Sequence, residues 1–379
     1  MKTWDAIVVG AGPAGCACAY DLAAAGHEVL LLDRAEFPRE KACAGGLTLK
    51  TVHALRYAVE PVVRRKISVM RLERDAARST YLRRSTPYCV MTVRQELDDF
   101  CFRRTLEAGV QFQRAATIEA ISEDSEGVTV FSGKETLRAR FLVGADGVHS
   151  RVRQLVGEGN GWFWRAFALE ARVRADPMEQ ELVFDFAPVR DGYGWIFPKG
   201  DHLNVGLYSY TRDEKIDRTR LSAYIRNRFA TAAVESVIGQ YAGFGAARHR
   251  PTADRIFLVG DAGGFVDPLT GEGIYFAVVS GQAAAEAIRA GLASPAAALE
   301  RFVLATAKLR ADLAVSTSAA RWFYGNLDLA YRFLTLRLLH RIVLKTFATG
   351  FSPGVLAARI RSVRHRSGRE NLSPDAAGS

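Results

Sequence analysis

The sequence predicts a mixed α/β fold, α+β overall, with a Rossmann-type domain assembled from separated segments, an inserted antiparallel sheet domain and a C-terminal helical region. Three observations predict this fold. Short apolar runs, the pattern of buried strands, lie far apart along the chain at 4–9, 28–33, 141–145 and 256–259. Apolar and polar residues alternate between them, as in antiparallel strands, at 166–174, 180–186 and 203–209. The pattern of residues 297–348 is helical throughout.

The remaining elements are predicted from local composition. Residues 13–25 form a small-residue helix that ends at Gly26, and residues 94–108 form a helix that ends at Gly109. Shorter strands are expected near 110–114, 117–121 and 127–131, and an Ala-rich helix at 272–290. These elements place the Rossmann-type domain at 1–56, 94–160 and 250–293, the sheet domain at 57–93 and 161–249, the helical region at 294–366 and a flexible tail at 367–379.

Composition excludes several classes of protein. A chain of 379 residues predicts two or three domains, since a domain averages about 150 residues. With 49% hydrophobic and 24% charged residues, it is neither disordered nor fibrous. Five cysteines without a CxxC pair argue against a disulfide framework and a metal site. The chain opens on a strand pattern and has no apolar run of 18 residues, so we expect a cytoplasmic protein that does not span a membrane.

The first glycine-rich turn, residues 10–15, joins a predicted strand to a predicted helix and has the pattern GxGxxG. Gly10 allows a tight turn, Gly12 lets the backbone approach a pyrophosphate, and Gly15 lets the helix pack closely on the strand. The helix N-terminus offers N–H groups and the positive end of its dipole to the phosphates. Asp33 ends the next strand, where its carboxylate can accept a hydrogen bond from a ribose hydroxyl. These features predict a dinucleotide site; a glycine turn without a ligand is the alternative.

Two further turns also follow buried strands. Residues 259–264 (VGDAGG) place Asp261 at a strand end, where it can bond the hydroxyls of a ribityl chain. Residues 267–274 (DPLTGEGI) then open a long helix, whose N-terminus would stabilise negative charge on a flat ligand such as a reduced flavin. Residues 143–153 (VGADGVHSRVR) repeat the order of strand, turn and helix. Each turn alone is uninformative, but all three in this order are specific.

Together these turns resemble the motifs of FAD-dependent oxidoreductases of the para-hydroxybenzoate hydroxylase-like superfamily. Arg94 matches an arginine that reaches the flavin in that superfamily, although an exposed arginine at a helix N-terminus is the alternative. Residues 37–46 (FPREKACAGG) further resemble the segment FPRxKxCGGG of geranylgeranyl reductases, with Ala44 in place of a glycine. Residues 192–198 (GYGWIFP) resemble their YxWxFP motif. The resemblance covers roughly residues 1–290.

The resemblance implies FAD as cofactor and assigns roles to individual residues. Cys43, Tyr193 and Trp195 are the expected catalytic residues, and Phe197 and Pro198 are expected to bind substrate. Tyr193, Trp195 and Phe197 alternate along a strand and would form an aromatic wall, unless they are simply a core face of the sheet. The residues expected to bind the cofactor are Gly10, Gly12, Ala14, Gly15, Asp33, Arg34, Lys41, Ala44, Gly45, Gly46, Arg94, Ile118, Asp146, Gly260, Asp261, Gly271, Gly273 and Ile274.

The expected reaction is saturation of C=C bonds in a prenyl chain on a lipid, a diphosphate or a quinone, by hydride transfer from the reduced flavin. A monooxygenase acting on an aromatic or quinone-like substrate is the alternative enzyme. A flavin-binding electron-transfer subunit is the alternative outside this chemistry. A second dinucleotide fingerprint is absent from the sequence, so the electron donor is expected to be transiently bound NAD(P)H, ferredoxin or another reductant.

Basic charge is concentrated at the C-terminus. Residues 301–379 hold 13 Lys/Arg and four Asp/Glu, whereas the whole chain has a net charge of +10. Arg337, Arg341 and Lys345, spaced by four, are expected to share a helix face. Such a helix suits an anionic membrane surface, a diphosphate group or a solvated face of the body. Nucleic acid is not expected as a partner, because no binding module accompanies the charge.

Overall fold

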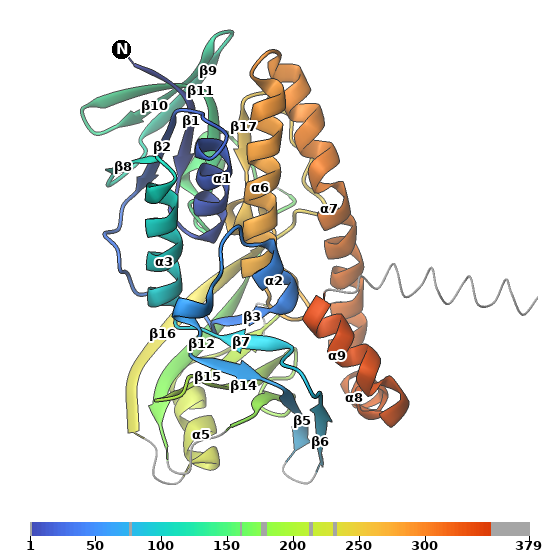
Figure 1. Cartoon of the computed structure of the whole chain (residues 1–379). Helices are drawn as coiled ribbons and strands as arrows, with labels where there is room; N and C mark the ends of the chain where they lie inside the picture. The colour runs from blue at the N-terminus through green and yellow to red at the C-terminus, as the bar shows by residue number, and fades with distance from the viewer. Residues whose placement is uncertain are drawn as a thin grey trace, which may run out of the picture.

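The computed structural model describes residues 2–75, 78–159, 161–175, 180–211, 215–229 and 233–349. In this part of the chain, two seven-stranded sheets lie at opposite ends of the molecule (Figure 1). Two long helices, α6 (Ile274–Gly291) and α7 (Pro295–Gly325), pack together along one side. No helix among the described residues is long and apolar enough to cross a bilayer.

The first sheet is the Rossmann-type one. Its strands, in spatial order, are β8 (Gln111–Arg114), β2 (Val29–Asp33), β1 (Thr3–Val9), β11 (Glu135–Gly144), β10 (Gly127–Ser132) and β9 (Ala120–Asp124), with β17 (Ile256–Leu258) beside β11. The strands β8, β2, β1, β11 and β17 run parallel, whereas β9, β10 and β11 are antiparallel. The four predicted buried runs therefore pair in one sheet, because each is apolar on both faces. The helices α1 (Pro13–Ala23), α3 (Arg94–Glu107) and α6 share the core on one of these faces.

The second sheet is almost entirely antiparallel. Its order is β16 (Ala233–Phe244), β12 (Trp164–Arg174), β15 (Leu203–Ser209), β14 (Gly192–Pro198), β13 (Leu182–Asp185), β5 (Val69–Asp75) and β6 (Arg78–Arg83), with β13 and β5 parallel. The period of two sends alternate side chains of β14 to opposite faces. Ile196 packs with helix α5 (Arg218–Arg228) on one face, and Trp195 packs with aromatic residues on the other. The predicted fold class is confirmed.

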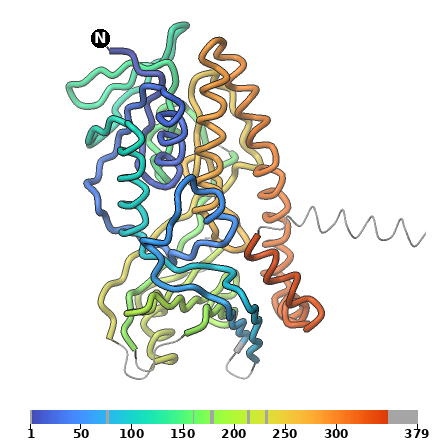
Figure 2. Tube along the Cα trace, viewed as in Figure 1, coloured from blue at the N-terminus to red at the C-terminus, as the bar shows by residue number. Residues whose placement is uncertain are grey.

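A small sheet lies where the two large sheets meet. It consists of β3 (Gly46–Thr48), β7 (Cys89–Met91) and β4 (Arg65–Ile67). Figure 2 traces the blue N-terminal chain from the first sheet down to this junction, where it forms β3 and then α2 (Leu49–Ala54) against α6. The short elements η1 (Glu60–Val62), α4 (Arg151–Leu155) and η2 (Gly260–Gly263) complete the two sheet domains.

The C-terminal region is helical, as predicted, and is divided into four elements. These are α7, α8 (Leu327–Thr335), η3 (Arg337–Leu339) and α9 (His340–Thr349). The chain breaks at Asn326, directly after Gly325, a poor helix former, and again at the extended Leu336. These breaks let Tyr331 bond the backbone oxygens of Leu72 and Arg78 at 3.1 and 2.8 Å.

The breaks also correct the expected basic helix face. Arg341 and Lys345 lie on α9, but Arg337 belongs to the preceding turn η3, so the three do not share one helix. The expected continuation of the helical region to residue 366 and the expected tail at 367–379 lie outside the described residues.

Candidate active site

The first glycine-rich turn leaves room for a ligand at one glycine only. A Cβ on Gly10, whose φ is +107°, would lie 2.3 Å from Ala145 O, and one on Gly15 would lie 1.7 Å from Gly10 O, so packing requires both glycines. A Cβ on Gly12 would meet only the Arg39 guanidinium, at 3.6 Å. No side chain caps α1 at Gly12. An open approach at Gly12 and an uncapped helix N-terminus fit the pyrophosphate of a dinucleotide.

Two predicted acids have backbone partners in the structure. Asp33 accepts hydrogen bonds from Ala11 N at 2.6 Å and Ala35 N at 2.9 Å, which ties the first turn to the end of β2. Asp146 accepts from the Ser150 hydroxyl at 2.6 Å and from the first two backbone N–H groups of α4. Burial raises the pKa of Asp146. These bonds hold both turns in shape, and the roles of both acids toward FAD stay predictions.

Other predicted cofactor residues lie around these turns. The Arg34 carbonyl accepts a hydrogen bond from Arg114, and Ile118 is buried in the core beside the first sheet. Ala14 lies against Gly260, whose added Cβ would be 3.0 Å from Ala14 Cβ. Asp261 accepts from Gly243 N at 3.3 Å. The turn after β17 therefore meets the first helix.

The loop before α6 is held by three tyrosines from the rest of the molecule. Tyr193 donates to Thr270 O, Tyr208 to Pro268 O at 2.9 Å and Tyr324 to Leu269 O at 2.7 Å. Burial raises the pKa of all three tyrosines. Three consecutive carbonyls thus turn toward the second sheet and α7. Gly271 and Gly273 follow in the same loop, and Gly273 begins α6 without a side-chain cap.

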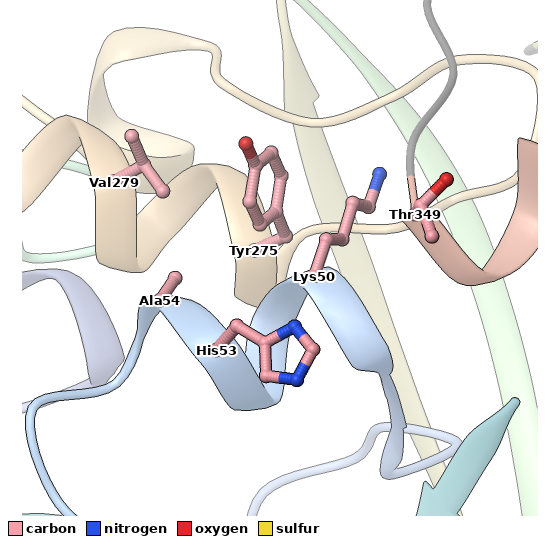
Figure 3. A pocket seen from close by; sticks show the side chains of 6 residues that line it. All are labelled: Lys50, His53, Ala54, Tyr275, Val279 and Thr349. Carbon is pink, nitrogen blue, oxygen red and sulfur yellow. The ribbon is translucent and has the colours of Figure 1, made fainter. Parts of the chain in front are cut away.

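A cavity lies beside the first turns of α6, on the side that faces α2. Figure 3 shows this cavity, of about 350 Å³, between α2 and α6 at the end of α9. Lys50 contributes to its wall and pairs with Glu272 at 2.6 Å. Glu272 also accepts from the Thr48 hydroxyl at 2.8 Å, which ties the loop to β3. None of the predicted site residues lines this cavity.

A buried cluster of charges lies behind the loop 41–46. Arg94 forms two hydrogen bonds of 2.9 Å with Asp98, and Arg39 pairs with Asp98 at 3.1 Å. Arg94 is buried, which excludes the exposed alternative. Burial would lower the pKa of Arg94, but Asp98 and the adjacent Cys43 outweigh it and raise that pKa. Burial and then Arg94 lower the pKa of Lys41. The cluster therefore offers positive charge beside the open position at Gly12.

Removing Asp98 should destabilise the fold strongly. Asp98→Ala leaves the buried Arg94 guanidinium, and the Arg39 guanidinium whose side chain is only 18% exposed, without their shared carboxylate, so we expect a loss of about 3–5 kcal/mol. Asp99→Ala is the matched control, because Asp99 pairs with Arg103, whose side chain is 68% exposed, and should cost less than about 1 kcal/mol. Urea unfolding measures both losses. Equal losses for the two variants would contradict the buried cluster.

The predicted aromatic wall adjoins both of the loops that are expected to hold the cofactor. Tyr193, Trp195 and Phe197 are all buried. A Cβ on Gly271 would lie 3.3 Å from the Tyr193 hydroxyl, and one on Gly46 would lie 3.6 Å from the Phe197 ring. The Trp195 indole donates to Asn204 at 2.6 Å. Segments around residues 46, 195 and 271 therefore meet at one place.

Two polar residues near the aromatic wall, Lys199 and Glu170, were not predicted from the sequence. Lys199 is 3% exposed and donates to Ala44 O. Burial lowers the pKa of Lys199 to about 8. Glu170 accepts from Cys43 N at 2.9 Å, and burial raises its pKa. Lys199 directly follows the matched GYGWIFP segment, so the sequence could have indicated it as a site residue. Nothing in the sequence indicates Glu170, because it lies on a strand far from the matched segments.

Comparison with known proteins places the chain among flavoproteins. Residues 3–297 match the family model described as an FAD binding domain. Geranylgeranyl diphosphate reductase of Rhodobacter capsulatus is 30% identical over 310 residues, or 77% of this chain and 76% of that protein. Menaquinone reductase of Mycobacterium tuberculosis is 30% identical over 314 residues, or 74% and 76%. A geranylgeranyl bacteriochlorophyll reductase-like structure from Thermoplasma acidophilum shares the fold, with a TM-score of 0.80 at 20% identity over 94% and 99%.

Proposed function

Because the chain belongs to the geranylgeranyl reductase family of FAD-dependent oxidoreductases, we propose that it saturates C=C bonds in a prenyl chain carried by a diphosphate, a lipid or a quinone. One observation carries the proposal: the aromatic wall adjoins both loops expected to hold the flavin, at Gly46 and at Gly271. An isolated alkene offers no polar group at its reacting carbons. Apolar side chains must therefore position it, and this wall supplies them beside the cofactor.

The other requirements of the reaction are a hydride, a proton and an apolar surface for the prenyl chain. When bound, reduced FAD would supply the hydride for one alkene carbon, and NAD(P)H, ferredoxin or another reductant would restore its reduced state. The second carbon needs a proton, which we assign to the half-buried Cys43 thiol. The Tyr193 hydroxyl is committed to Thr270 O, so Tyr193 positions the loop. Trp195 and Phe197, followed by Pro198, provide the apolar surface for the prenyl chain.

Anaerobic mixing of the reduced flavoprotein with prenyl substrates tests this function. Oxidised-flavin absorbance should return at a rate that rises with the concentration of geranylgeranyl diphosphate or of a prenylated quinone. A fully saturated analogue is the control and should leave the flavin reduced. Absence of reoxidation by every prenyl substrate, with reoxidation by oxygen in the presence of an aromatic substrate, would support the monooxygenase instead.

We further propose that the protein takes its substrate from a membrane surface. Large apolar side chains lie exposed along α7, α8, η3 and α9: Trp322, Leu329, Phe333, Leu336, Leu338 and Ile342. Leu338 is 92% exposed. Exposed Arg321, Arg332 and Arg337 lie among them. Apolar side chains mixed with basic ones suit the interface of an anionic bilayer.

Substitution of Leu338 should weaken membrane binding. Leu338→Asp removes an apolar contact and adds like charge, so we expect binding to anionic phosphatidylglycerol vesicles to fall by about tenfold. Leu304→Asp is the matched control, since Leu304 is 62% exposed but lies apart on α7. Vesicle flotation measures both. A loss of binding as large for Leu304→Asp as for Leu338→Asp would contradict the proposal.

A further inference from the structure

A cavity of about 540 Å³ lies between the loop that follows β6 and helix α9. Its polar lining comes from both sides. Arg83 at the end of β6 and Arg84, Ser85 and Thr86 of the loop line one side, and His340, Arg341, Lys345 and Thr349 line it from α9. Leu344 completes the lining, which contains no carboxylate. The cavity therefore combines positive charge with hydroxyl groups and a small apolar part.

The arginines of this cavity are available to a ligand. Among the described residues, no ion pair joins Arg83, Arg84 or Arg341 to a carboxylate. Arg83 stacks on the Tyr81 ring at 5.0 Å, which fixes the direction of its guanidinium. Guanidinium groups bind phosphate oxygens through paired N–H donors. A phosphate or diphosphate monoester matches this donor set.

The apolar part of the cavity leads to the aromatic wall. Leu344 is buried in the same core cluster as Tyr193, Trp195 and Phe197. Phe347, one turn further along α9, has its ring 5.8 Å from Phe184, whose ring is 5.2 Å from Tyr193. A molecule with an anionic head and a long apolar tail could thus have the head in the cavity and the tail among these rings.

We propose that this cavity, named here the α9 pocket, binds the phosphate or diphosphate head of the prenyl substrate. The inference rests on the proposed function and makes it more specific, because neither a quinone nor a neutral lipid carries such a head. A tail that runs from the α9 pocket to Tyr193 must part the rings of Phe347 and Phe184. Helix α9 is accordingly expected to shift when the substrate binds.

Calorimetric titration of the FAD-loaded full chain with inorganic pyrophosphate tests the pocket without needing turnover. The wild type should show saturable binding, weakened at least tenfold in both Arg84→Ala and Arg341→Ala, because each loses a charge-assisted hydrogen bond. Arg289→Ala, exposed at the end of α6, is the matched control and should bind as the wild type does. Flavin content and circular dichroism confirm that each variant is folded. Absence of saturable binding, or equal weakening in the control, overturns the proposal.

Two further experiments distinguish binding of a substrate diphosphate from binding of an anionic membrane surface. In Arg341→Ala, KM for geranylgeranyl diphosphate should rise about tenfold while KM for a prenylated quinone stays unchanged. If Arg341→Ala instead loses binding to phosphatidylglycerol vesicles and keeps binding pyrophosphate, the basic residues serve a membrane and the pocket proposal fails. If pyrophosphate binds but no prenyl chain is reduced, the α9 pocket is an anion site and the proposed reaction is wrong.

Discussion

Gly12→Val is expected to give a folded protein that no longer retains FAD. The backbone φ of Gly12 is −79°, which any residue adopts, and an added Cβ would meet only the end of the Arg39 side chain, at 3.6 Å. Packing within the protein therefore does not require a glycine at this position. The close approach of a pyrophosphate to the backbone would require one. We expect FAD affinity to fall by about 100-fold or more, equivalent to about 2.7 kcal/mol.

The ratio of flavin to protein absorbance measures FAD retention, and the thermal midpoint of unfolding measures whether the variant is stably folded. Gly325→Val is the matched control, because nothing lies within 4 Å of an added Cβ there, and should keep both FAD and stability. Gly15→Val should fail to fold, since its Cβ would overlap Gly10 O. Normal FAD retention by Gly12→Val would contradict the assignment of the pyrophosphate to this turn.

Lys199→Met is expected to reduce turnover by about 100-fold and to remove a pH dependence. The Lys199 ammonium donates to Ala44 O and so positions the loop that carries Cys43. Since burial lowers its pKa to about 8, wild-type activity should be high below pH 8 and fall above it as the ammonium loses its proton. The variant should lack that alkaline decline. Lys66→Met, at an exposed position on β4, is the matched control.

The stability contributed by Lys199 should change with pH in the opposite direction to the activity. The folded pKa of Lys199 lies below the ordinary value of 10.5, so the unfolded chain binds more protons between about pH 8 and 10.5. The cost of the buried ammonium is fully present below pH 8 and is relieved as the pH rises through this window. Relative to Lys199→Met, the wild type should therefore gain stability from pH 8 to 10.5. Parallel unfolding curves for the two proteins over this window would contradict a buried, shifted lysine.

The parts of the fold that the sequence predicts are those with local signals. Strand, turn and helix follow one another within residues 3–23, and each turn glycine has its own geometric demand. The cysteines of α1, Cys16 and Cys18, are buried in the core beside the first sheet. The break at Asn326 follows a glycine, whereas the break at Leu336 has no local signal and comes with the packing of α8 on β5 and of α9 on β3.

The parts of the site that were missed depend on contacts between distant segments. Glu170 reaches Cys43 across 127 residues, and Lys199 reaches Ala44 across 155. Pairing of β12, β15 and β14 sets these contacts, and no spacing within one segment encodes them. Asp98 was missed for a different reason: it lies one helical turn after Arg94, where a pair at i and i+4 usually indicates an exposed helix face.

Mass spectrometry of the product, with the reduced flavoprotein held under nitrogen and offered geranylgeranyl diphosphate, distinguishes reduction of the prenyl chain from its oxygenation. We expect products heavier by about 2 Da for each C=C bond saturated, formed without oxygen, with Cys43→Ala much slower than the wild type and Cys18→Ala unchanged. Products heavier by about 16 Da that form only when oxygen is admitted would contradict the proposed reduction, because oxygen insertion, not hydride and proton addition, would then be the reaction of this flavin site.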